Sequence, residues 1–156
     1  MPSDLGAPTD EERERPQMWR YWRALPPKGK IGIFFGSWYS VPVMQRVLGK
    51  AKSRKLDQNI ERINRFEKML TDEGALILKF WLHLSKDVQK KRLKSLEKNP
   101  ETRWRVTDTD WKHYKLYDKF RKIAQHTLRE TSTAEAPWII VEGTDFRYRG
   151  LTVGKV

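Results

Sequence analysis

Apolar residues in this chain occur in two patterns, short continuous runs and stripes at helical spacing, and the two patterns alternate. The continuous runs are Ile31–Phe35, Leu76–Leu82 and Trp138–Val141. Each is typical of a strand that is buried on both faces of a parallel sheet. Since helical stripes separate the runs, we predict an α/β protein with three layers, in which helices cover both faces of a parallel sheet.

The helical stripes also indicate where individual helices begin and end. The strongest stripe runs from Leu56 to Asp72, and Gly74 is expected to end that helix. Thr107 is expected to cap a long helix that continues to Arg129, and Thr9 one that continues to the Pro26-Pro27 pair. Residues 42–50 are expected to form a short helix.

The first apolar run ends at Gly36, and the turn after it is expected to consist of Ser37, Trp38 and Tyr39. Ligands of open α/β sheets bind beyond the carboxyl ends of the strands. This turn therefore lies where a phosphoryl-transfer enzyme holds the acid that binds magnesium. No Asp or Glu occurs between Lys30 and Tyr39.

Charge points to a polyanionic partner. The chain has 32 Lys and Arg residues against 20 Asp and Glu, a formal net charge of +12, which favours polyphosphate, nucleotide, nucleic acid or an anionic membrane surface. The positive charge is densest between Lys86 and Arg105, in a helix that Ser85 is expected to cap. From the residues alone, this run is equally consistent with a solvated helix face, and Arg20 and Arg23 with salt bridges to nearby acids.

Length and composition limit the remaining possibilities. The 156 residues are enough for one domain. The sequence has no cysteine, no apolar run of membrane-spanning length and no signal peptide in its polar start, so we expect a cytoplasmic protein without a membrane partner. His83 has no cysteine or second histidine near it in sequence and is expected to be structural rather than a metal ligand.

Residues 18–39, 79–111 and 136–149 together resemble one known family, the polyphosphate kinase 2 family of P-loop phosphotransferases that move phosphate between polyphosphate and nucleotides. Residues 18–39, MWRYWRALPPKGKIGIFFGSWY, resemble the family pattern MWRxWRxLPxxGxIxIFDRSWY. Residues 79–111 resemble its third strand, basic lid and following helix, and residues 136–149, APWIIVEGTDFRYR, its last strand and loop. The pattern is most similar to the degenerate amino-terminal repeat of two-domain polyphosphate:AMP phosphotransferases.

The resemblance implies a P-loop-kinase-like fold with a basic helical lid at about residues 85–110. It implies that residues 1–156 are a single partial domain, truncated at the N-terminus so that the Walker A strand is missing. The near-site acids would be Glu142 and Asp145. The residues that the resemblance implies for phosphate binding are Arg20, Arg23, Lys90, Lys91, Arg92, Lys94 and Arg103.

The implied activity is transfer of phosphate from polyphosphate to AMP or ADP with magnesium. This sequence departs from the family because Phe35-Gly36 replaces the family Asp-Arg. We therefore assign no catalytic residue and no metal ligand, and expect the segment alone to be inactive and to bind no magnesium. It would support a second catalytic repeat by packing, by forming a homo-oligomer or by holding polyphosphate. The alternative is a basic module that binds nucleic acid or protein without phosphotransfer activity.

Overall fold

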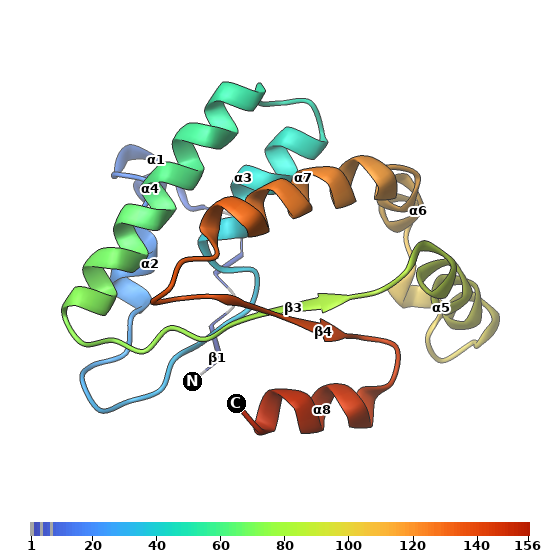
Figure 1. Cartoon of the computed structure of the whole chain (residues 1–156). Helices are drawn as coiled ribbons and strands as arrows, with labels where there is room; N and C mark the ends of the chain where they lie inside the picture. Colours follow the sequence, from blue (N-terminus) through green and yellow to red (C-terminus); the bar gives the residue numbers. More distant parts are fainter. Residues whose placement is uncertain (1, 4, 7) are drawn as a thin grey trace. The chain divides into compact units, whose positions relative to one another are not determined.

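The strands of this protein pair in parallel, as the sequence predicts, and helices connect them (Figure 1). The structure, drawn in Figure 1, is a computed structural model that describes residues 2–3, 5–6 and 8–156. The chain divides into two compact units, Met1–Phe66 and Glu67–Val156. Each unit contains one two-stranded parallel sheet.

The first unit contains β1 (Pro2–Ser3), α1 (Asp10–Glu14), α2 (Trp19–Ala24), β2 (Ile33–Phe34), α3 (Ser37–Val47) and most of α4 (Ser53–Asp72). The predicted N-cap is confirmed, because Thr9 and Glu12 exchange hydrogen bonds of 3.0 and 3.2 Å in a capping box. The prediction of one continuous helix up to Pro26 is wrong. Pro16 disfavours a helical conformation at Arg15, whose ψ of 161° is extended, and so separates α1 from α2.

The aromatic core of the first unit surrounds Trp38. Its ring lies 5.8 Å from Tyr21, 5.8 Å from Phe34 and 5.1 Å from Phe66, measured between ring centroids. The prediction that Ser37, Trp38 and Tyr39 form a turn is therefore wrong. They form the first turn of α3, and Trp38 and Tyr39 are buried because their rings enter this core.

The prediction that Ile31–Phe35 is buried on both faces is also wrong. The strand β2 is limited to Ile33–Phe34, and the side chains of Ile31 and Phe35 are 83% and 65% exposed. A strand is buried on both faces only where other elements cover both. In this unit Phe34 packs against Trp38, whereas its neighbours in the run point to solvent.

The second unit contains the end of α4, β3 (Lys79–His83), α5 (Lys86–Lys98), η1 (Arg103–Arg105), α6 (Asp108–Lys115), α7 (Tyr117–Thr131), β4 (Trp138–Glu142) and α8 (Phe146–Gly154). Strand β3 pairs with β4 from Lys79 opposite Trp138 to His83 opposite Glu142. The predicted third strand is confirmed to within one residue, but the second begins at Lys79 rather than Leu76, which is 81% exposed.

Helices α6 and α7 replace the single helix predicted from Thr107 to Arg129. The Thr107 cap is confirmed, since its side chain and that of Asp110 form a capping box. Leu116 lies outside the helical region with a ψ of 6° and divides the two helices. Helix α7 packs on the strand pair through Phe120, whose ring is stacked 5.9 Å from that of Trp81.

A buried ion pair joins α4 to β3 in the second unit. The ammonium Nζ of Lys79 lies 2.7 Å from Oε2 of Glu67 and 2.6 Å from the carbonyl oxygen of Thr131, at the end of α7. Burial lowers the pKa of Lys79, and the hydrogen bond to Glu67 partly offsets that effect. No helix in the described part of the chain has the length and apolar character of a membrane span.

Candidate phosphate-binding surfaces

The basic lid forms a helix with solvent-exposed cations. Ser85 caps α5 through the backbone amide of Val88, which confirms the predicted helix start. Beyond Lys98 the chain turns into η1, and the Thr102 hydroxyl donates to the carbonyl of Leu96 at 2.9 Å, which holds η1 against α5. The exposed cations of these two elements include the five expected to bind phosphate, Lys90, Lys91, Arg92, Lys94 and Arg103.

These five lid cations have no carboxylate partner within 4.0 Å in the described part of the chain. Lys86, at the start of the same helix, differs because it pairs with Asp118 on α7. The pKa of Lys86 is raised by that hydrogen bond. The other lid cations therefore remain available to an external anion, and Lys90 and Lys94 project from one face of α5 because they are four residues apart.

The two arginines of α2 lie in different environments. Arg20 is buried, and its guanidinium donates to the carbonyl oxygens of Leu5 and Gly6 and lies 3.6 Å from Glu12. Arg23 is exposed and stacks over the ring of Trp19 at 4.7 Å. Arg20 thus holds the segment before α1 against α2, while Arg23 keeps an accessible charge.

At the end of β2, Phe35 and Gly36 offer neither a carboxylate nor a guanidinium. Gly36 has a φ of 71°, in the left-handed region that favours glycine. A Cβ built at Gly36 would lie 2.7 Å from the Ser40 hydroxyl oxygen, and this hydroxyl donates to the Gly36 carbonyl. The backbone at this junction is therefore adapted to glycine.

The two acids at the end of β4 and in the loop that follows it are engaged in local structure. The Glu142 carboxylate accepts from the hydroxyl and the backbone amide of Thr144, and these bonds lower the pKa of Glu142. Asp145 is the N-cap of α8 and accepts from the amides of Arg147 and Tyr148 at 2.7 and 2.9 Å. Both acids belong to the second unit, whereas Gly36 belongs to the first.

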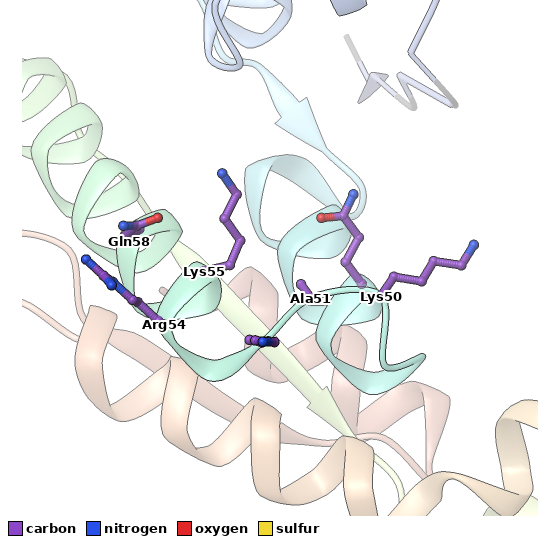
Figure 2. Close-up of a pocket in the computed structure, with 7 residues that line it drawn as sticks. Lys50, Ala51, Arg54, Lys55 and Gln58 are labelled. Carbon is purple, nitrogen blue, oxygen red and sulfur yellow. The ribbon is translucent and has the colours of Figure 1, made fainter.

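One basic surface was missed by the sequence reasoning. A pocket of about 420 Å³, the α3–α4 pocket, lies where α3 connects to α4 (Figure 2). The signal for it was present in the sequence, because four of the six residues from Lys50 to Lys55 are cationic. The residues that line it are Gln45, Lys50, Ala51, Lys52, Arg54, Lys55 and Gln58.

Comparison with known families identifies the class of protein. The model of the family "Polyphosphate kinase 2 (PPK2)" matches residues 3–156. The chain therefore belongs to the polyphosphate kinase 2 family, and the resemblance predicted from its three sequence segments is confirmed.

Two relatives within the family show how much of a longer protein this chain matches. It is 56% identical over 149 residues to the polyphosphate:AMP phosphotransferase of Pseudomonas aeruginosa, a match that covers 96% of this chain and 30% of that protein. It is 36% identical over 154 residues to the AMP/ADP-polyphosphate phosphotransferase of Meiothermus ruber, covering 99% of this chain and 58% of the relative. The chain thus spans about a third to somewhat over half of these proteins.

A solved structure supports the same fold. The crystal structure of polyphosphate kinase 2 from Arthrobacter aurescens superposes with a TM-score of 0.92 at 33% sequence identity, over 97% of this chain and 54% of that one. The predicted fold class, an α/β fold like that of the P-loop kinases with a parallel sheet, is confirmed.

Proposed function

We propose that this chain is part of a polyphosphate-dependent nucleotide phosphotransferase acting on AMP or ADP, and that this segment is itself non-catalytic. The observation that carries the proposal is the end of β2, where the exposed Phe35 and the left-handed Gly36 stand in place of the family Asp-Arg. A phosphoryl-transfer site needs anchored cations and metal ions beside the phosphates. This junction supplies neither.

The carboxylates of the described residues are not arranged to bind the magnesium ion that the family implies. Magnesium takes oxygen ligands in near-octahedral geometry, usually from one or two carboxylates together with phosphates. The carboxylates of Glu142 and Asp145 accept hydrogen bonds from their own loop and from the start of α8. The described part of the chain contains no cluster of three potential metal-ligating side chains. The proposal therefore assigns magnesium binding to the remainder of the enzyme.

The role left for this segment is to hold polyphosphate and to pack against a catalytic repeat or a second copy. The exposed cations of α5 and η1 support the first part, because a polyanion bound there releases counterions. Exposed apolar side chains support the second part, since such groups commonly mark interaction surfaces. Examples are Ile31 and Phe35 in the first unit and Phe146 and Leu151 in α8.

An activity assay tests the non-catalytic role. The purified 156-residue chain should form no ADP or ATP from polyphosphate with AMP or ADP and magnesium, with the Meiothermus ruber relative as positive control. Chelator-sensitive turnover above the no-enzyme rate would contradict the proposal. The double variant Phe35→Asp/Gly36→Arg should also be inactive, because a side chain at position 36 meets Ser40 in a left-handed backbone.

A binding assay tests the polyphosphate-holding role separately. Long polyphosphate should bind with an affinity that falls as salt rises. The variant Lys91→Ala/Arg92→Ala should weaken binding more than the matched variant Lys119→Ala/Lys122→Ala, which removes two exposed charges from α7. Tighter binding of single-stranded DNA of equal charge would favour the nucleic-acid module instead.

A further inference from the structure

The α3–α4 pocket is formed by residues 45–58, outside the lid at about residues 85–110, and most of the residues that line it are positively charged. Its lining contains four cations, two glutamine amides and an alanine, and no acidic side chain. Lys50, Lys52, Arg54 and Lys55 are all exposed, and none has a carboxylate partner within 4.0 Å among the residues that the structure describes. Four unpaired cations on one short segment give this surface a positive potential, which favours the binding of an anion.

The backbone beneath these cations is held in place. Gly49 has a φ of 75°, and the amides of Lys50 and Ala51 both donate to the carbonyl of Gln45, at 2.8 and 3.1 Å. The Arg46 guanidinium donates to the Ser53 hydroxyl at 3.2 Å, which links the end of α3 to the start of α4. Figure 2 shows Lys50 and Ala51 on the connection and Arg54, Lys55 and Gln58 on the first turns of α4. The charges are therefore carried by a defined turn.

The lining chemistry selects the kind of anion. Lysine ammonium groups are point charges that suit phosphate oxygens, and the glutamine amides can donate further hydrogen bonds. Proteins that hold single-stranded nucleic acid combine a basic groove with aromatic side chains on which the bases stack. None of the seven lining residues is aromatic. The pocket is shallow and open to solvent, so charge rather than enclosure would hold the ligand.

From these observations we propose that the α3–α4 pocket is a second anion site that binds a short stretch of phosphoanhydride chain, independently of the lid. The choice of a phosphoanhydride ligand rests on the proposed function, but the site itself does not depend on the lid residues. In a longer polyphosphate, this pocket would hold a segment of the chain at the first unit.

Tripolyphosphate is the probe for this site. Binding to the 156-residue chain is measured by calorimetry at low salt for three double variants, each of which neutralises two exposed cations. The pocket variant is Lys52→Gln/Lys55→Gln, the lid variant Lys91→Gln/Arg92→Gln and the control Lys119→Gln/Lys122→Gln. The pocket variant should bind about threefold to tenfold more weakly than the control. The slope of log affinity against log salt should fall by about 2.

Protection from acetylation locates the ligand. Tripolyphosphate should slow acetylation of Lys52 and Lys55, followed by mass spectrometry, and leave Lys119 and Lys122 unaffected. Equal loss of affinity in the pocket and control variants, or equal protection of all four lysines, would mean diffuse attraction and would overturn the proposal. Preference of the pocket for single-stranded DNA of matched charge would overturn it as well. Loss of affinity in the lid variant alone would refute the pocket site while leaving the proposed function intact.

Discussion

Replacing Lys79 with methionine is expected to destabilise the second unit strongly. The side chains of Lys79 and Glu67 are 5% and 2% exposed, so neither charge can be solvated when its partner is removed. Removing one member of a buried pair costs about 3–5 kcal/mol of unfolding free energy, because the other charge remains buried. The thermal midpoint of a unit of this size should fall by about 10 °C or more.

The double variant Glu67→Met/Lys79→Met separates charge burial from packing. Replacing both members of a buried pair with apolar residues of similar length is often nearly neutral, because no uncompensated charge remains. The Thr131 carbonyl would keep a donor, since the Thr133 amide lies 3.2 Å from it. We therefore expect the double variant to be within about 1.5 kcal/mol of the wild type, although each single change is severe.

Urea denaturation followed by circular dichroism and tryptophan fluorescence measures all four members of this cycle. The control is Lys68→Ala, which breaks the exposed Lys68–Asp72 pair on the same helix and should leave the midpoint unchanged. Two results would refute a buried Lys79–Glu67 ion pair. One is a midpoint shift for Lys79→Met no larger than that for Lys68→Ala. The other is a double variant that loses as much stability as the two single variants combined.

The pair also predicts a pH dependence. Because burial holds the pKa of Lys79 below its ordinary value of 10.5, the unfolded chain binds a proton that the folded chain has lost between the two pKa values. Unfolding free energy therefore rises with pH in that window. In Glu67→Gln the carboxylate that raises the pKa is gone, so the window should extend to lower pH. Identical pH profiles for the two proteins would refute this reasoning.

Three further changes test the loop after β4 and a helix start. Gly143→Ala would place a Cβ 2.9 Å from the His83 carbonyl oxygen and should cost about 1–3 kcal/mol in urea denaturation; an unchanged midpoint would contradict the close approach. Thr144→Val removes the hydroxyl that donates to Glu142, so the pKa of that carboxyl should rise toward 4.5 in an NMR titration, and a constant pKa would count against the bond. Thr107→Ala removes an N-cap and should cost about 1 kcal/mol, with loss of helicity confined to α6 and no loss if the cap is unimportant.

Features set by neighbouring residues could be predicted from the sequence. The caps at Thr9, Ser85 and Thr107 are examples, because a side chain that bonds an amide three residues later depends only on local spacing. The helix that begins at Ser53 ends as predicted near Gly74, whose left-handed φ of 87° stops it. Pro16 also acts locally, because it disfavours a helical conformation at Arg15 and so ends α1. The break was not predicted, because the apolar residues after Pro16 keep helical spacing.

Features that depend on distant partners could not be predicted. An apolar run does not reveal how many elements cover it, so Ile31 was expected to be buried and is exposed. Lys79 lies within an apolar strand, and nothing near it in sequence identifies Glu67 and Thr131 as its partners. The α3–α4 pocket likewise depends on how the connection turns after Gly49, although its basic residues are adjacent in sequence.

The parallel pairing of β3 with β4 has a consequence for synthesis. Two parallel neighbours need a long crossover, and Lys79 reaches the Thr131 carbonyl 52 positions later in the chain. At about 5–20 residues per second, the ribosome needs on the order of 3–12 seconds after β3 to complete β4. During that interval Phe80 and Trp81 lack the pairing with β4 that they have in the folded chain. Translation pauses placed between the codons for β3 and β4 should therefore increase aggregation of the newly made protein more than pauses placed after β4.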